Sequence, residues 1–129
     1  MSHILVIEDD QQMREMVKQM LQRAGYSAIG AGDGREGMQI VREQAIDLII
    51  TDIIMPDQEG LETIMQVRRE YPNIPVIAIS GGGRVEPENY LHSAKLLGAA
   101  YTFAKPLNRD EMIRVVTQLL LHYHGSGEG

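Results

Sequence analysis

Five short apolar runs alternate with amphipathic stretches along this chain, and the alternation restricts the folds open to it. Runs of Ile, Val, Leu and Ala without strict alternation suit strands that are buried on both faces. Between the runs, apolar residues recur every three or four positions, as on one face of a helix. Strands joined by helical crossovers form a parallel sheet with helices on both sides, so we expect a single-domain, doubly wound α/β sandwich with strand order 2-1-3-4-5. The five expected strands lie at residues 4–7, 26–31, 47–51, 76–79 and 99–104.

Five helices are expected between and after these strands, and most have a recognisable start or stop signal. Asp33, Asp57 and Asn108 suit helix N-caps, and Pro87 suits the first turn of a helix. Gly25 suits the left-handed residue that ends a helix, and a second glycine at 98 ends the fourth helix. We interpret all eight methionines, which lie at helical spacings and include Met65, as core packing. The residues expected to face inward in the first two helices are Met13, Met16, Val17, Met20, Leu21 and Ala24, and then Met38, Val41 and Ala45.

Length, charge and composition exclude several classes of protein. The 129 residues fit one domain, expected over 1–123, with 124–129 as a disordered tail, a linker stub or an expression scar. The absence of cysteine excludes disulfides, thiol catalysis and cysteine-bound metals. The net charge of −6 without a basic stripe predicts no direct nucleic-acid binding. No run approaches the ~20 apolar residues of a membrane span, and an apolar strand begins within three residues of the N-terminus, so we expect a cytoplasmic protein without a signal peptide.

A single carboxylate, Asp52, follows the most apolar strand, and burying a lone charge costs several kcal/mol unless something pairs with it. Ligands of doubly wound sheets bind beyond the carboxyl ends of the strands. Residues 8–10 (Glu-Asp-Asp), Ser80 and Lys105 also directly follow expected strands. With strand order 2-1-3-4-5, the acids after the first and third strands share one cleft. Two carboxylates ~4 Å apart repel by about 4 kcal/mol at an effective dielectric near 20.

Two cations can relieve this repulsion. Lys105 supplies one from the last strand, and a hard divalent cation such as magnesium, which prefers oxygen ligands, would supply the other. A carboxylate beside magnesium and a lysine is suited to accept a phosphoryl group. The Ser80 hydroxyl could then donate a hydrogen bond to that group. Asp10 is better interpreted as the N-cap of the first helix.

Four segments in this order and spacing, ILVIEDD, LIITDIIMPDQEGLE, VIAISG and GAAYTFAKPL, resemble the receiver domains of two-component response regulators over residues 3–123. The resemblance implies a flavodoxin-like fold and a phosphorylation-activated signalling switch rather than an enzyme. Its phosphodonor would be a sensor histidine kinase, a phosphotransfer protein or a small molecule such as acetyl phosphate. Phosphorylation would change the face at residues 84–123, which a downstream protein or output domain would read and through which two copies could pair.

The resemblance also implies a role for individual residues. Asp52 is the phosphoacceptor and a magnesium ligand, and Asp9 is a direct ligand. Glu8 acts through a bound water, and the backbone carbonyl of Ile54 completes the protein ligands.

Ser80 is the switch hydroxyl in this resemblance, and Lys105 pairs with the phosphoryl group; the bond from Lys105 to Pro106 is similar to a cis peptide of the family. The chain departs from the family pattern at Thr102, where an aromatic residue is usual, and at Gly81, where alanine is usual.

Ile54 and Gly82 occupy the two variable positions that flank the phosphoryl group in the family. Neither side chain can orient an attacking water. We therefore predict slow loss of the phosphoryl group by self-dephosphorylation.

Three other functions compete with the switch. A degenerate receiver would act as a phosphate-independent protein-binding module, but every acceptor residue is present. An aspartyl-phosphate hydrolase would need a second acid where Ile54 stands, and a flavin carrier would need a phosphate loop where the acidic EDDQQ lies. The segment GAGDGR at 30–35 resembles a dinucleotide fingerprint, but it ends in Arg35 and follows the second strand rather than the first.

Overall fold

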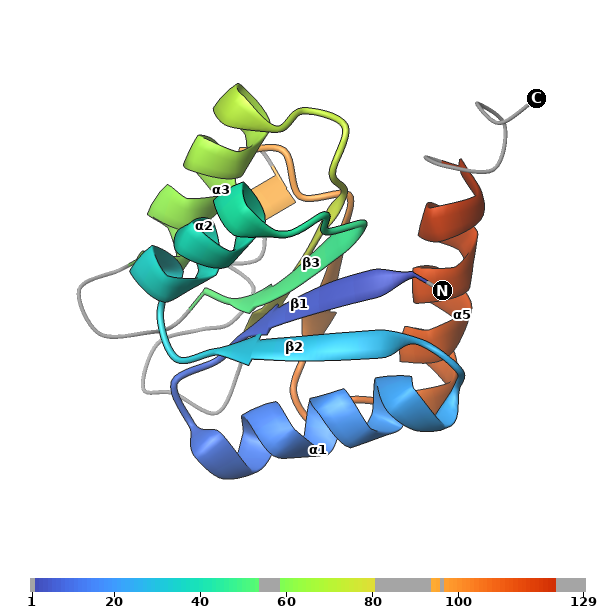
Figure 1. Cartoon of the computed structure of the whole chain (residues 1–129). Helices are drawn as coiled ribbons and strands as arrows, with labels where there is room; N and C mark the ends of the chain where they lie inside the picture. The colour runs from blue at the N-terminus through green and yellow to red at the C-terminus, as the bar shows by residue number, and fades with distance from the viewer. Residues whose placement is uncertain (1, 54–58, 81–93, 96, 123–129) are drawn as a thin grey trace.

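The computed structural model describes residues 2–53, 59–80, 94–95 and 97–122. Its centre is a five-stranded parallel sheet in the order β2-β1-β3-β4-β5, which confirms the predicted fold and strand order (Figure 1). The observed strands begin or end within two residues of the predicted ones, and Asp52 is the last residue of its strand rather than the first after it. The strands are β1 (His3–Ile7), β2 (Ser27–Ala31), β3 (Leu48–Asp52), β4 (Val76–Ser80) and β5 (Tyr101–Ala104).

Four helices lie within the described residues and cover the two faces of the sheet. Figure 1 shows α1 (Gln11–Arg23) and α5 (Arg109–Leu120) on one side, and α2 (Gly34–Glu43) and α3 (Glu59–Glu70) on the other. Most of the fourth expected helix, at 87–97, lies outside the described residues, although Ala94 and Lys95 are helical. Within the described part of the chain, no helix is long and apolar enough to cross a membrane.

Two hydrophobic cores form because successive strand residues point to opposite faces of the sheet. Leu5 and Ile7 of β1 pack into the core beneath α2 and α3. Ile4 and Val6 pack into the core beneath α1 and α5. A slip of one residue in strand register would exchange these two sets, so burial on both faces specifies the register strongly.

The predicted helix signals are confirmed wherever the structure describes them. The side chains of Asp10, Asp33 and Asn108 accept hydrogen bonds of 3.1, 2.8 and 2.9 Å from the main-chain N–H three residues later. Gly25 and Gly98 have φ angles of 100° and 115°, in the region that favours glycine. Asp57 lies outside the described residues.

Four residues expected in the core are exposed instead. Met16 is 45% exposed and Met65 is 47% exposed, and each is one position away from a fully buried residue of its helix. One position is a rotation of 100°, which turns these side chains toward solvent. Ala24 is exposed at the C-cap of α1, and Ala45 follows the end of α2, where Ile46 takes the buried position.

Gly60 provides a test of how closely α3 packs on the end of β3. A Cβ at this position would lie 2.6 Å from the carbonyl oxygen of Asp52 and closer still to Ile53 Cα, and neither backbone atom can move freely. We expect Gly60→Ala to lower the free energy of unfolding by about 2 kcal/mol, although alanine is the better helix former. Gly32→Ala is the matched control, because its Cβ would meet nothing closer than 3.6 Å. Equal urea midpoints for the two variants would contradict this packing.

Candidate functional site

The carboxyl ends of three adjacent strands bring polar residues to one edge of the sheet. Glu8 directly follows β1, Asp52 ends β3 and Ser80 ends β4, and their exposed fractions are only 4%, 4% and 0%. The strand register aligns these ends, since Ile7 pairs with Thr51 and Asp52 pairs with Ile79. The predicted convergence of groups from different strands is therefore observed.

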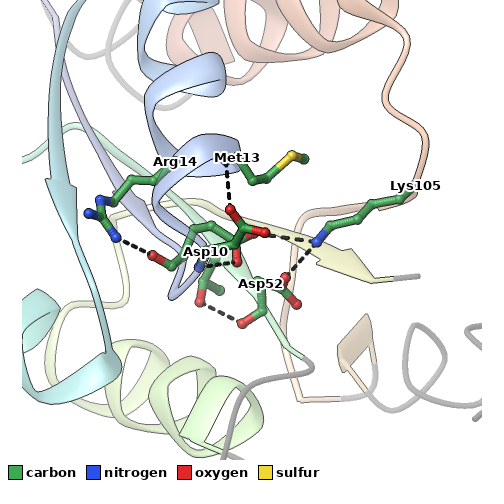
Figure 2. A network of polar contacts seen from close by, with 7 residues as sticks. Asp10, Met13, Arg14, Asp52 and Lys105 are labelled. Atoms are coloured by element: carbon green, nitrogen blue, oxygen red, sulfur yellow. Dashed lines mark hydrogen bonds and ion pairs between the residues drawn. The ribbon is translucent and has the colours of Figure 1, made fainter. Parts of the chain in front are cut away.

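Lys105 supplies the predicted positive charge. Its Nζ lies 2.8 Å from Asp52 Oδ2 and 3.4 Å from Glu8 Oε1, so one ammonium bridges both buried carboxylates (Figure 2). The main-chain N–H of Lys105 donates a 2.8 Å hydrogen bond to the carbonyl of Ser80, which fixes the lysine to the end of β4. The peptide bond from Lys105 to Pro106 is cis, as predicted.

The site carries more negative charge than one lysine balances. Burial raises the pKa of Glu8 to about 8, and the hydrogen bond and charge of Asp52 add to the rise, against smaller opposing effects of the Asp10 N–H and Lys105. Burial lowers the pKa of Lys105, but its hydrogen bond to Asp52 and the two nearby carboxylates outweigh burial, so that pKa is raised overall. A second cation would complete the charge balance.

The residues present fit a divalent metal ion. One carboxylate oxygen each of Glu8, Asp9 and Asp52 lies within 4.8 Å of the other two, which suits a shared hard cation such as magnesium. The Ser80 hydroxyl is fully buried and has no hydrogen-bond partner among the described residues, although buried hydroxyls normally have one. Ile54, the fourth expected ligand, lies outside the described residues.

Asp9 and Asp10 have different surroundings. The Asp10 carboxylate caps α1 by accepting from the Met13 N–H, as expected, and its own N–H donates to Glu8 Oε2 at 3.1 Å (Figure 2). Asp9 is exposed, and its carboxylate forms no hydrogen bond with another described residue. Asp9 is therefore available as a ligand, whereas Asp10 has a structural partner.

The face occupied by the aromatic residues of β5 follows from strand alternation. Phe103 is buried in the core beneath α1 and α5, and Tyr101 packs against that core with its ring centroid 4.9 Å from that of Phe103. Thr102 points to the opposite face, where its strand partner Ala78 also lies. The two aromatic residues beside Thr102 therefore do not take over its position on the α2–α3 side.

Arg14 was not singled out from the sequence, yet it contacts this site. Its guanidinium donates a 2.8 Å hydrogen bond to the main-chain carbonyl of Glu8. The only available signal was an arginine in the helix that follows the acidic residues. Its target is a main-chain atom, which no side-chain pattern reveals.

Residues 4–117 match the sequence model of the response regulator receiver domain. This chain belongs to that family. The match covers all of the sheet except its first residue, His3, and it includes the site, so it confirms the resemblance inferred from the four sequence segments.

One curated relative is the uncharacterized transcriptional regulatory protein YrkP of Bacillus subtilis, which is 32% identical over 117 residues. That alignment covers 90% of this chain but 48% of YrkP, so the chain spans about half the length of this relative.

Solved receiver structures have the same architecture. A response regulator receiver domain protein from Clostridium thermocellum superposes with a TM-score of 0.86 at 25% identity, covering 95% of this chain and 96% of that one. The response regulator TrrA of Thermotoga maritima, solved in complex with Mg(2+)-BeF, has a TM-score of 0.81 at 28% identity, covering 92% of this chain and 99% of that one.

Magnesium binding can be tested through stability. At a Mg²⁺ concentration ten times Kd, binding to the native state alone would raise the free energy of unfolding by about 1.4 kcal/mol. We expect Asp9→Asn to lose most of this gain, measured by urea denaturation with and without Mg²⁺. Asp10→Asn is the matched control, since it removes the same charge one residue away and asparagine is an equally good N-cap. Equal losses in both variants would indicate a general charge effect rather than a ligand.

Proposed function

We propose that this chain is a phosphorylation switch that accepts a phosphoryl group on Asp52. The observation that carries the proposal is the buried Asp52 carboxylate, paired with Lys105 at 2.8 Å and clustered with Glu8 and Asp9. A carboxylate in such a site is held in place and is close to groups that can neutralise a phosphoryl group. Membership of the receiver family supports the same reading.

The proposed reaction is an in-line transfer to a carboxylate. An Asp52 oxygen attacks phosphorus and forms a new P–O bond. The bond from phosphorus to the nitrogen or oxygen of the donor breaks, and the donor leaves with that electron pair. Magnesium, held by Glu8, Asp9, Asp52 and the Ile54 carbonyl, would supply positive charge to the phosphoryl oxygens.

Lys105 and Ser80 would bind the transferred group. The Lys105 ammonium already lies between Glu8 and Asp52 and can move its hydrogen bond from the carboxylate to a phosphoryl oxygen. The Ser80 hydroxyl, which has no partner among the described residues, can donate to another oxygen. The aspartyl phosphate would carry about −1.5 to −2 charges in place of the single charge of the carboxylate, and these donors would stabilise it. Ser80 would thereby couple phosphorylation to the loop that follows β4.

The proposed partners follow from family membership. The phosphoryl donor would be a sensor histidine kinase, a phosphotransfer protein or a small phosphodonor, and the face at 84–123 would be read by an output domain or by a second copy. YrkP is named a transcriptional regulatory protein, so the prediction of no nucleic-acid contact applies to this domain and not to a longer chain. Location in the cytoplasm also stays a prediction from the sequence.

The phosphate-independent binding module is the less favoured alternative. Loss of phosphorylation would remove the need to keep two carboxylates buried beside one lysine, which is costly without a function. The described part of the chain retains the acid cluster, the lysine and the buried hydroxyl together.

Intact-mass spectrometry after incubation with acetyl phosphate and Mg²⁺ tests the proposal. We expect one phosphoryl group on the wild type, and none on Asp52→Asn or with EDTA. Asp33→Asn is the matched control, because it removes an exposed carboxylate from another helix N-cap and should be phosphorylated normally. A wild type that gains no phosphoryl group and is not stabilised by Mg²⁺ would favour the binding module instead.

The lifetime of the phosphorylated protein is a separate prediction. Ile54 and Gly82 lie outside the described residues, so slow self-dephosphorylation rests on the sequence. We expect Ile54→Asn to shorten the lifetime several-fold, because an amide could orient the attacking water. Loss of the phosphoryl mass after removal of the donor gives the rate, with Ile54→Val as the apolar control. Equal lifetimes in all three proteins would contradict the prediction.

A further inference from the structure

The Arg14 side chain reaches back from the first turn of α1 to the acidic turn at residues 8–10. Its NH1 group donates a partly buried 2.8 Å hydrogen bond to the main-chain carbonyl of Glu8 (Figure 2). The Arg14 main-chain N–H donates to the Asp10 carbonyl at 2.9 Å, which is the first hydrogen bond of the helix. Arg14 therefore connects α1 to the acidic turn through both its main chain and its side chain.

The main chain of Glu8 is held from both directions. Its N–H donates to the carbonyl of Ala31 at the end of β2, at 3.0 Å, and its carbonyl accepts from Arg14. The carbonyl belongs to the planar peptide that leads into Asp9, so its direction sets the direction from which the Asp9 residue departs. The Arg14 hydrogen bond thus orients that peptide.

Asp9 depends on this restraint more than the other two acids do. The carboxylates of Glu8 and Asp52 are buried and bound by Lys105. The Asp9 side chain is exposed and forms no hydrogen bond with another described residue, yet its oxygen lies within 4.8 Å of the other two ligand atoms. Its position follows from the backbone that carries it, and Arg14 helps to fix that backbone.

Glycines of β2 and the loop after it make room for the arginine. A Cβ on Gly30 would lie 3.0 and 3.3 Å from Cδ and Cγ of Arg14 and 3.2 Å from Cδ of Lys18, closer than most such contacts in proteins. A Cβ on Gly32 would lie 3.8 Å from the NH1 group. Glycine inside a strand commonly marks the close approach of another group. The segment GAGDGR at 30–35 does not match the dinucleotide fingerprint. Its first two glycines, Gly30 and Gly32, leave the space that the Arg14 side chain occupies.

We propose that Arg14, passing over Gly30, is a positioning residue that presets the Glu8–Asp9 turn for its divalent cation. The inference rests on the proposed function, since it concerns the metal of that site. For the affinity of the cation, this inference predicts the opposite change from the one that charge alone predicts. Removing a positive charge near an acidic site should strengthen cation binding, whereas removing a residue that orients the ligands should weaken it.

Direct binding of Mn²⁺, followed by electron paramagnetic resonance of the free ion, tests the inference without a reaction. We expect Arg14→Gln to weaken Mn²⁺ binding about tenfold, the lower end of the range for residues that orient metal ligands. Lys18→Gln is the matched control, because Lys18 lies one helical turn away, packs beside Arg14 near Gly30 and carries the same charge. Lys18→Gln should bind Mn²⁺ as tightly as the wild type or more tightly.

Gly30→Val provides a second test that leaves Arg14 in the chain. Valine favours strands, so this variant should fold, but its side chain would occupy the path of the Arg14 stem. Weaker Mn²⁺ binding without loss of stability is the expected result. In Gly30→Val and Arg14→Gln, phosphorylation by acetyl phosphate should need a higher Mg²⁺ concentration to reach half its maximal rate. At saturating Mg²⁺, the rate should equal that of the wild type. If Arg14 only stabilised the fold, both variants would be phosphorylated more slowly than the wild type at every Mg²⁺ concentration.

Two failures can be told apart. If the wild type binds Mn²⁺ but Arg14→Gln and Gly30→Val bind it equally well, the positioning role is wrong and the proposed function stands. If the wild type itself binds no Mn²⁺, both the positioning role and the proposed metal site are wrong.

Discussion

The ion pair between Asp52 and Lys105, with Glu8 as third member, links the carboxyl ends of β1, β3 and β5. Two buried carboxylates at adjacent strand ends would destabilise the native state unless a cation lay between them. Lys105 supplies this cation, since its Nζ lies 2.8 Å from Asp52 Oδ2 and 3.4 Å from Glu8 Oε1. The lysine directly follows β5, the strand at the far edge of the sheet, so the pair forms only when β4, which lies between β3 and β5, is in register with both. The charge cluster and the fold are thus mutually dependent.

The two apolar cores maintain that register. Burial on both faces of the sheet means that a one-residue slip would place every side chain of a strand in the wrong core. At the end of β3, the absence of a side chain on Gly60 lets α3 approach the backbone of Asp52 closely. On the other face, Gly30 admits the stem of Arg14. Close packing against the backbone on both sides therefore helps to fix the acidic site at the carboxyl ends of the strands.

Most of the fold and much of the site could be predicted from the sequence because each rests on a local pattern. Apolar runs gave the strands, cap residues such as Asp33 and Asn108 gave the helix starts, and strand order brought Asp52 to the acids after β1. Met16 was misplaced because helical spacing alone does not give the width of the buried face.

Arg14 could not be recognised because its contact is with the main-chain carbonyl of Glu8, and no pattern of side chains reveals a main-chain partner. That the Ser80 hydroxyl has no hydrogen-bond partner among the described residues likewise depends on its full three-dimensional surroundings. The first feature concerns how the main chain of the site is held, and the second concerns which donor is available there. Neither changes which side chains form the site. The sequence pattern identifies the functional side chains. Their orientation is set by the backbone geometry, which is visible only in the folded chain.

Phosphorylation of Asp52 is tested most directly by locating the phosphoryl group chemically. Borohydride reduces an aspartyl phosphate to an alcohol, which leaves homoserine at the modified position, and peptide mass mapping after acetyl phosphate treatment identifies that position. We expect homoserine at position 52 alone, and only when Mg²⁺ is present. Modification at Ser80, at Asp9 or at any other residue, or modification of Asp52 that is independent of Mg²⁺, would contradict it.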